Sequence, residues 1–310
     1  MSACGKLSQS SVGALLGALL SCLTPACDDS LKSVSLIEET RVLGARVELA
    51  SDATRSSPQP GEQASLRLFL AAPVEPAQVS YTLSVCAVSP VNTGFPSCAS
   101  APFASVQQAQ PTSSEPALDF RVPADLDLIA TPHALASAFV CPDGPLSVDE
   151  NDRPNCGNGA GTAVNFEFDL GGPDYANHSP SITADALTWD DAPWPEAPES
   201  ATCDDLRAVS AGSTHTLAIT IPDADFEALT QSTSLEPARE TLLVSQFSSS
   251  GQLSHAFLSL SEDTAPADRR VTWQAPKVSA AEPTLARFYF VVRDARGGED
   301  FATRAVCVHP

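Results

Sequence analysis

The sequence predicts an all-β chain that folds into two tandem antiparallel β-sandwiches behind an export signal. Apolar and polar residues alternate with a period of two over several short segments, such as residues 64–70 and 216–221, which is the pattern of a half-buried strand. The 310 residues also contain 26 prolines and one methionine. Proline interrupts helices but is tolerated at strand edges and in turns, so this composition disfavours a helix-rich enzyme.

The first sandwich is expected over residues 39–172. Its turn at Pro60-Gly61 precedes the first expected strand, and Pro123 ends the third. Segment 134–140 does not alternate cleanly, which is typical of a strand that is covered on both faces. The five expected strands are residues 64–70, 79–85, 118–123, 134–140 and 164–170.

The second sandwich is expected over residues 181–310. Its expected strands are residues 216–221, 241–247, 271–276, 287–293 and 303–308. Each segment matches its counterpart in the first half, and the five matches follow in the same order. We interpret the halves as two copies of one fold, divided between residues 171 and 180. A chance agreement of generic strand patterns is the alternative.

The most recognisable element is the last hairpin. Two apolar segments, 288–294 and 301–308, flank the stretch Ala295-Arg296-Gly297-Gly298-Glu299-Asp300. We expect the two glycines to supply the positive φ that a tight connection needs. This strand pair resembles the closing pair of an immunoglobulin-like sandwich, and the resemblance implies that fold for both halves.

The N-terminus carries the features of an export signal. Lys6 precedes the apolar run 12–20, which is too short to span a bilayer but has the length of a signal-peptide core. Leu19-Leu20-Ser21-Cys22 resembles the bacterial lipobox, which implies lipidation of Cys22 after cleavage. We therefore expect a lipoprotein signal peptide over residues 1–21 and a tether over residues 22–38. Cys27 is a rival lipid site, and secretion without a lipid is the alternative.

A lipobox, sandwich-like modules and a final Arg296-Gly297-Gly298 hairpin that ends in Cys307-Val308 occur together in this chain. The combination resembles envelope lipoproteins of myxobacterial type with tandem immunoglobulin-like domains. The resemblance implies an exported protein in the bacterial cell envelope, and we expect its lipid anchor in the outer membrane. It implies no activity.

Charge restricts the class of partner. With 17 Lys and Arg against 38 Asp and Glu, the formal net charge is −21 and the pI is about 4.4. Such a chain repels the phosphate backbone of nucleic acids and gains nothing from anionic lipid surfaces. We therefore expect no nucleic-acid partner, contact with the membrane only through a lipid anchor, and an envelope protein of unknown identity as partner.

Six cysteines beyond Cys27 form an even set, and export would place them in an oxidising compartment. Six thiols allow about 15 pairings. Proximity and the domain plan favour Cys86–Cys98 and Cys141–Cys156 in the first sandwich and Cys203–Cys307 in the second. No Cys-x-x-Cys occurs among the six and no histidine pair has zinc spacing, so structural disulfides are favoured over a metal site, and no cofactor is expected.

Few residues suggest chemistry. Trp189 and Trp194 either form an exposed ligand face or pack as a plug, and we favour the plug; Trp273 is expected in the core. The acidic stretch 149–152 has oxygen ligands at a spacing seen in calcium loops, but Arg153 and Pro154 follow it, which favours solvated charge. No Gly-x-Ser-x-Gly elbow occurs, although a Ser-His-Asp triad can assemble from distant positions.

These observations favour a non-catalytic, lipid-anchored envelope protein that acts as a protein-interaction or spacer module. A carbohydrate- or calcium-dependent binding module is the first alternative and needs an exposed Trp189/Trp194 face or a completed acidic site. A hydrolase whose triad the sequence hides is the second alternative.

Overall fold

The computed structural model describes residues 33–310, apart from 74–77, 91–93, 143, 152, 158, 160, 173–174, 198–200, 230–237 and 278–281. The expected signal peptide, Cys22, Cys27 and most of the tether lie outside the described residues. The regular elements are β-strands and three short 3₁₀ turns, η1 (Cys203–Asp205), η2 (Asp223–Asp225) and η3 (Pro266–Arg269). No helix in the described part of the chain has the length and apolar character needed to cross a membrane.

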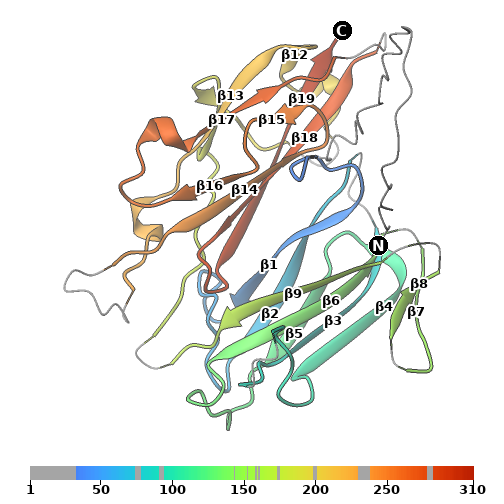
Figure 1. The fold of residues 1–310 in the computed structure, drawn as a ribbon, viewed down its shortest axis with the longest axis vertical. Helices are drawn as coiled ribbons and strands as arrows, with labels where there is room; N and C mark the ends of the chain where they lie inside the picture. The colour runs from blue at the N-terminus through green and yellow to red at the C-terminus, as the bar shows by residue number, and fades with distance from the viewer. Residues whose placement is uncertain are drawn as a thin grey trace, which may run out of the picture. The chain divides into compact units, whose positions relative to one another are not determined.

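The first sandwich consists of two facing antiparallel sheets (Figure 1). One sheet has the order β1-β2-β5, with β1 (Arg41–Leu49), β2 (Gln63–Ala71) and β5 (Ala117–Arg121). The other has the order β4-β3-β6-β9, with β4 (Ala104–Ser113), β3 (Val79–Ala87), β6 (His133–Cys141) and β9 (Thr162–Asp169). A small two-stranded sheet, β7 (Leu146–Val148) and β8 (Pro154–Cys156), follows β6.

The second sandwich repeats this plan with two five-stranded sheets. The first has the order β11-β10-β13-β17-β15, with β11 (Ala192–Pro193), β10 (Leu187–Trp189), β13 (Thr214–Ile219), β17 (Arg270–Gln274) and β15 (Gln252–Leu253). The second has the order β12-β19-β18-β14-β16, with β12 (Ala208–Ser210), β19 (Glu299–His309), β18 (Thr284–Arg293), β14 (Leu242–Ser248) and β16 (Phe257–Leu260).

Strand order confirms two tandem sandwiches of immunoglobulin-like topology. In each half the first and third expected strands pair with each other, β2 with β5 and β13 with β17. The second, fourth and fifth form the facing sheet, β3-β6-β9 in one half and β14-β18-β19 in the other. This division of strands between two sheets is that of the immunoglobulin fold. The agreement between the five expected strands of each half therefore reflects a shared topology.

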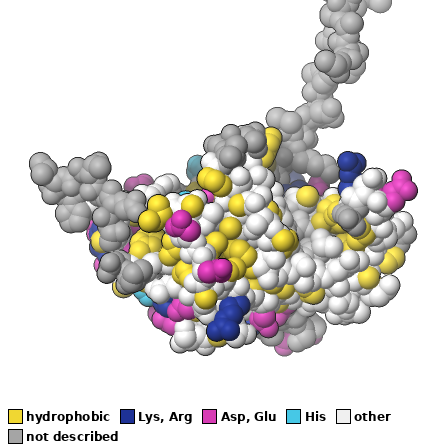
Figure 2. Space-filling model, turned by 90° about the horizontal axis from the view of Figure 1, so that it is seen from below, with side chains coloured by type: hydrophobic (Ala, Val, Ile, Leu, Met, Phe, Trp, Pro, Cys, Tyr) yellow, Lys and Arg dark blue, Asp and Glu magenta, His cyan; other side chains and the backbone are white. Residues whose placement is uncertain are grey.

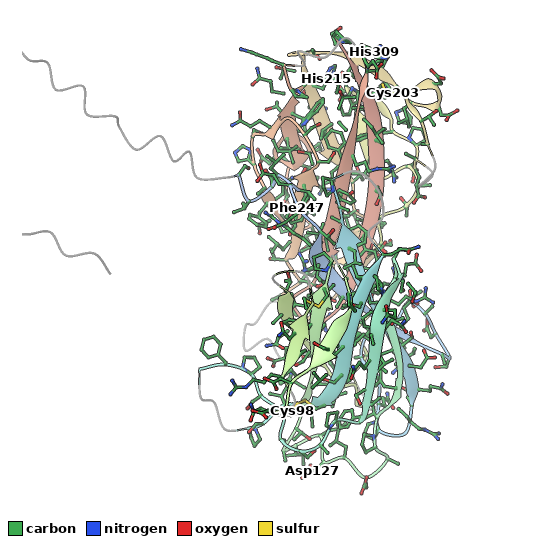
Figure 3. The ribbon with its side chains drawn as sticks, turned by 90° about the vertical axis from the view of Figure 1, so that its right-hand side faces the viewer. Cys98, Asp127, Cys203, His215, Phe247 and His309 are labelled. Atoms are coloured by element: carbon green, nitrogen blue, oxygen red, sulfur yellow. A yellow bond between two sulfur atoms is a disulfide. The ribbon has the colours of Figure 1, made fainter. Side chains whose placement is uncertain are left out.

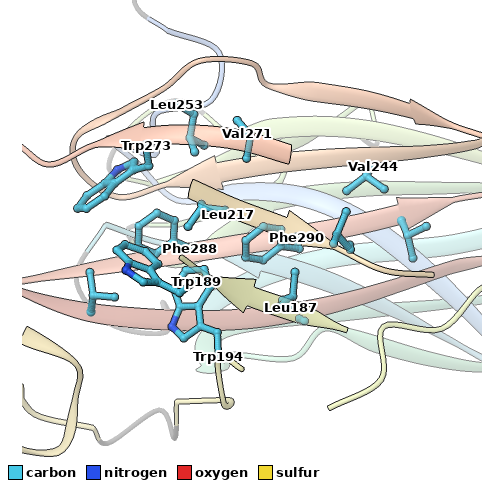
Figure 4. Close-up of a cluster of buried hydrophobic side chains, with 14 of the residues drawn as sticks. Leu187, Trp189, Trp194, Leu217, Val244, Leu253, Val271, Trp273, Phe288 and Phe290 are labelled. Atoms are coloured by element: carbon cyan, nitrogen blue, oxygen red, sulfur yellow. The ribbon is translucent and has the colours of Figure 1, made fainter. Parts of the chain in front are cut away.

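The two cores follow from the alternation in the sequence. In β5 and β17 every second residue is buried, as a period of two requires when one face of a sheet packs on its partner. In the second core, aromatic rings meet edge to face: the Trp189 centroid lies 4.7 Å from that of Trp194 and 5.6 Å from that of Trp273 (Figure 4). Ring pairs at such distances add to the stability gained from burial alone.

Trp189 and Trp194 are 1 % and 2 % exposed, so the alternative that they form a ligand face is wrong, and they pack as the expected plug. The indole N–H of Trp194 donates to the Ala305 carbonyl, which satisfies its polar atom inside the core. Trp273 is fully buried, as expected.

Strands β6 and β18, which do not alternate, are covered on both faces as expected. The outer face of β18 carries Tyr289 and Val291, which pack against Ile37, Leu43 and Ala71. The outer side of β6 meets a small cluster that contains Leu146 and the Cys141–Cys156 pair. A strand with two buried faces gains stability from apolar residues at every position.

The structure contains the three favoured disulfides, Cys86–Cys98, Cys141–Cys156 and Cys203–Cys307. The paired cysteines are 12, 15 and 104 residues apart in the sequence. Cys307 lies in β19, which runs parallel to β12 just after Cys203. The third bond therefore ties the entry of the second sandwich to its last strand.

Candidate functional site

The tip of the β18–β19 hairpin reaches the first sandwich. Its backbone has positive φ at Ala295 and Gly297, so the expectation that both glycines have this conformation is wrong for Gly298. A Cβ atom at Gly297 would clash with Phe168 of β9. Both the positive φ and the close approach of Phe168 therefore require glycine at this position. Asp294 organises the turn, because its Oδ1 accepts hydrogen bonds from the backbone N–H groups of Arg296 (2.7 Å) and Gly298 (2.9 Å).

Arg296 is the centre of a polar network at the junction of the two sandwiches. Its guanidinium donates to Tyr175 Oη (3.1 Å) and to Glu227 Oε2 (2.7 Å), and it forms an ion pair with Glu240. Tyr175 in turn donates to Asp169 of β9 at 2.5 Å. This chain of contacts joins the second sandwich to the first through the segment between them. Two histidines extend it: His133 bonds Asp169, and His178 bonds Glu227.

A second set of contacts joins the same hairpin to the edge of β1. Glu299 Oε2 accepts from the backbone N–H of Ala45 at 2.9 Å, and its Oε1 accepts from Arg293 at 2.7 Å. Arg293 also donates to the Leu43 carbonyl. The hairpin side chains thus satisfy backbone groups of β1 that no neighbouring strand pairs, which removes part of the exposed edge of the sheet.

Aromatic side chains complete the junction. The rings of Phe69 and Phe301 stack with centroids 4.3 Å apart, and Tyr289 Oη donates to the Ala72 carbonyl at 2.6 Å. Beside this contact lies a groove of about 330 Å³, whose walls include Arg67, Arg287 and Glu196. A smaller cavity of about 240 Å³ lies between β1, β9 and the hairpin tip.

Burial raises the pKa of several carboxyl groups at the junction. Glu240 and Glu299 are 2 % and 8 % exposed at their side chains. Burial raises the pKa of each to about 7, against the opposing effect of Arg296 and Arg293 respectively. Burial also raises the pKa of Asp294 and of Asp300 above the ordinary value. No motif in the sequence predicts this cluster, because its members are scattered along the chain.

A second cluster lies at the far end of the second sandwich, the end at which Figure 3 labels His215, Cys203 and His309. Ser213 Oγ lies 2.8 Å from His215 Nε2, and His215 Nδ1 lies 2.7 Å from Asp190 Oδ2. The other oxygen of Asp190 accepts from the Thr216 backbone N–H at 2.8 Å. This is the atom order of a Ser-His-Asp triad.

Local structure fixes each member of this cluster. Ser213 directly precedes β13, and His215 is the second residue of that strand, so their side chains lie on one side of the extended chain and meet in a hydrogen bond. Asp190 and Asp191, with φ of 49° and 64°, form the two-residue turn between β10 and β11. Burial alone would raise the pKa of Asp190, but hydrogen bonds from His215 and Thr216 hold it below its ordinary value.

The remaining sequence candidates lie apart from these clusters. Asp149 Oδ1 accepts from the backbone of Asn151 and Arg153 and so caps its own loop; Asp152 lies outside the described residues. Asp205 caps η1 through Thr202. Nowhere in the described chain do three or more His, Cys, Asp or Glu side chains form a group that could hold a metal ion. On the face shown in Figure 2, apolar side chains are interspersed with polar and acidic ones.

No protein-family model matches the sequence, and no curated protein matches it. Among similar solved structures, a nucleoside hydrolase-related hypothetical protein from Saccharophagus degradans is 17 % identical with a TM-score of 0.24, over 43 % of this chain and 26 % of that one. The tandem V-type regions of VCBP3, a v-region-containing chitin binding protein, are 9 % identical with a TM-score of 0.25, over 87 % of this chain and 100 % of that one.

Salmonella α2-macroglobulin is 12 % identical with a TM-score of 0.22, over 88 % of this chain and 15 % of that one. The chain thus spans about a quarter of the first of these proteins and less of the third. At such TM-scores the likenesses carry no argument about function. The assignment of the fold rests on the order of strands in the sheets.

Proposed function

We propose that this chain is a lipid-anchored protein of the bacterial envelope whose two sandwiches serve as a protein-interaction or spacer module, held in one mutual orientation by their junction. The proposal assigns no chemistry to the junction. The partner is an envelope protein, and membrane contact comes from the lipid at the N-terminus, with Cys22 as the lipidated residue and Cys27 as its rival.

The junction carries this proposal. A flexible link between modules needs few contacts, whereas here Arg296, Glu299 and Phe301 each bond or stack with residues outside the second sandwich. The ion pair between Arg46 of β1 and Asp300 of β19 crosses the junction. Partly buried pairs of this kind hold partners in a defined register, because any displacement separates a charge from its partner. A defined register is what a spacer needs in order to present one module at a fixed position from the other.

Export has independent support. The three disulfides support export, because disulfides are rare outside oxidising compartments, and the lipobox-like Leu19-Leu20-Ser21-Cys22 supports a lipid anchor. The resemblance to myxobacterial envelope lipoproteins favours the outer membrane. The carbohydrate-binding alternative lacks such support, because Trp189 and Trp194 are buried. The calcium-binding alternative lacks it as well, because no three acidic or other ligating side chains gather in the described part of the chain.

Distance measurements between the sandwiches test the spacer role. Nitroxide labels can be placed at the exposed positions Asp119 and Thr272 through an introduced unnatural amino acid, which leaves the disulfides untouched. Double electron–electron resonance should give one narrow distance distribution. The distribution should broaden in a double variant, Arg293→Ala with Arg296→Ala, and stay narrow in the matched loop variant Arg153→Ala. A broad distribution in the unchanged protein would refute the proposal.

A further inference from the structure

The cluster at the far end of the second sandwich has no part in the junction. We propose that Ser213, His215 and Asp190 form a nucleophile–base–carboxylate triad that transfers acyl groups from small esters to water. This activity goes beyond the spacer role and would make the expectation of a non-catalytic chain wrong.

The polarity of the contacts suits this chemistry. A carboxylate at Nδ1 holds a proton on that nitrogen and leaves the lone pair of Nε2 directed at the serine hydroxyl. Asp190 is itself held by the Thr216 N–H and by the tight turn that it begins, so the imidazole has a fixed orienting group. The imidazole also lies against the Trp189 ring, at 4.8 Å between centroids, which excludes water from one of its faces.

The serine proton has two acceptors within reach. Ser213 Oγ lies 2.5 Å from the Ser210 carbonyl oxygen and 2.8 Å from His215 Nε2. Rotation about the Cβ–Oγ bond moves the proton from one acceptor to the other while every heavy atom stays in place. The hydroxyl can thus rest on the Ser210 carbonyl and turn to the imidazole when a substrate arrives.

The strand also offers a donor for the oxyanion. The Ser213 carbonyl accepts from Ala275 of the neighbouring chain segment, and Thr214 faces Gln274, so the N–H of Thr214 points away from β17. Thr216, two residues on, directs its N–H to Asp190 on that same edge. The Thr214 N–H therefore lies on the open edge beyond Asp190, directly after the nucleophile, where acyl-transfer enzymes place a backbone donor.

The reaction has two balanced halves. Ser213 Oγ bonds to the carbonyl carbon of the ester and its proton passes to His215 Nε2; the bond to the alcohol then breaks, and the alcohol leaves with that proton. Water next attacks the acyl-serine, gives a proton to Nε2, and the bond to Ser213 breaks as Oγ regains the proton. One ester and one water yield one acid and one alcohol.

The surroundings indicate the class of substrate. His215 is 17 % exposed and Asp190 48 % exposed at their side chains, so the site is open to solvent. Asp190, Asp191 and the net charge of −21 disfavour anionic esters. Small neutral esters of short acyl groups fit these conditions.

The test uses the full folded chain with p-nitrophenyl acetate and a fluorophosphonate probe. We expect probe and acetyl adducts on the peptide that contains Ser213, and slow release of nitrophenol. Ser213→Ala should abolish the probe adduct and the acetyl adduct. His215→Gln and Asp190→Asn should each lower the rate of labelling by the probe on the order of 100-fold or more. The matched control is Ser254→Ala, which removes a hydroxyl 3.0 Å from His255 Nδ1 outside the cluster, and this variant should react as the unchanged protein does.

Circular dichroism and thermal unfolding show whether each variant is folded. The adduct on the unchanged protein needs no variant, so the proposal stays testable if a substitution disturbs the fold. An unlabelled Ser213 in the folded protein, or equal labelling of a folded His215→Gln variant, would overturn the triad. Labelling of other serines only would overturn it as well.

Discussion

Arg296, at the tip of the last hairpin, forms an ion pair with Glu240, whose side chain is 2 % exposed. The same guanidinium donates to Tyr175, in the segment between the sandwiches. One side chain thus neutralises a buried carboxylate and joins the two halves of the chain. The energetic consequences of this arrangement can be measured.

Removal of the Arg296 side chain should lower the free energy of unfolding. Arg296→Ala leaves Glu240 buried without its partner, and breaking a buried pair from one side costs about 3 kcal/mol or more. Arg296→Met combined with Glu240→Gln removes both charges and should recover part of that loss. Urea unfolding at pH 8, above the pKa of about 7 of Glu240, gives the free energies, and additive losses in the double variant would contradict the pairing.

The buried carboxyl groups should make stability depend on pH. The pKa of Glu240 and of Glu299 is raised by burial to about 7 in the folded chain, against 4.5 for an unperturbed glutamate. Between these pH values the folded state binds more protons than the unfolded state. The free energy of unfolding should therefore fall as pH rises from 4.5 to 7, by a few kcal/mol for each group at about 1.4 kcal/mol per pKa unit.

Glu240→Gln and Glu299→Gln should each flatten this dependence, because an amide does not titrate. Glu39→Gln, at an exposed position, serves as the matched control. Urea midpoints at several pH values between 4.5 and 8 provide the measurement. A slope of the opposite sign, with stability rising over this range, would show that the ion pairs outweigh burial.

The disulfides should differ in their contribution to stability. In the chain-entropy model, a crosslink that closes a loop of about 100 residues contributes about 4.7 kcal/mol, against about 3 kcal/mol for a loop of about 15 residues. Replacement of Cys203 and Cys307 by Ala should therefore lower the melting temperature more than replacement of Cys141 and Cys156. Calorimetry of both variants tests the order, and peptide mapping of the non-reduced protein tests the pairing.

Lipidation should depend on one N-terminal cysteine. Growth of the expressing bacterium with a labelled fatty acid should transfer label to the chain, and Cys22→Ala should abolish the transfer. Label that is lost in Cys27→Ala instead would assign the rival site. Label that survives both substitutions would defeat the anchor and leave secretion without lipid.

Local pattern carried most of the prediction of the fold. Alternation in segments such as 118–123 and 271–276 is a property of neighbouring residues, and the strands β5 and β17 follow from it. The disulfide pairs followed from proximity and from the domain plan. Two-sided burial of β18 was visible as a lack of alternation, although the sequence did not reveal that Ile37 and Leu43 cover it.

The polar network at the junction and the Ser213–His215–Asp190 cluster could not be predicted from the sequence, for a physical reason. Glu299 meets Ala45 across 254 residues, and the pattern of neither segment encodes the other. Asp190 precedes His215 by 25 residues, and only the pairing of β10 with β13 brings them together. Such contacts depend on tertiary packing. The local signal available for the triad was a Ser-x-His where a turn leads into a strand.

The contact between Glu299 and the edge of β1 bears on the order in which the molecule assembles. All strands of the first sandwich end by Asp169, whereas the hairpin that caps β1 spans Thr284 to His309. During synthesis or export from the N-terminus, the earlier module can therefore fold while the flank of β1 is still bare. Exposed strand edges recruit other chains, so this interval is the one in which a chaperone would have most to protect.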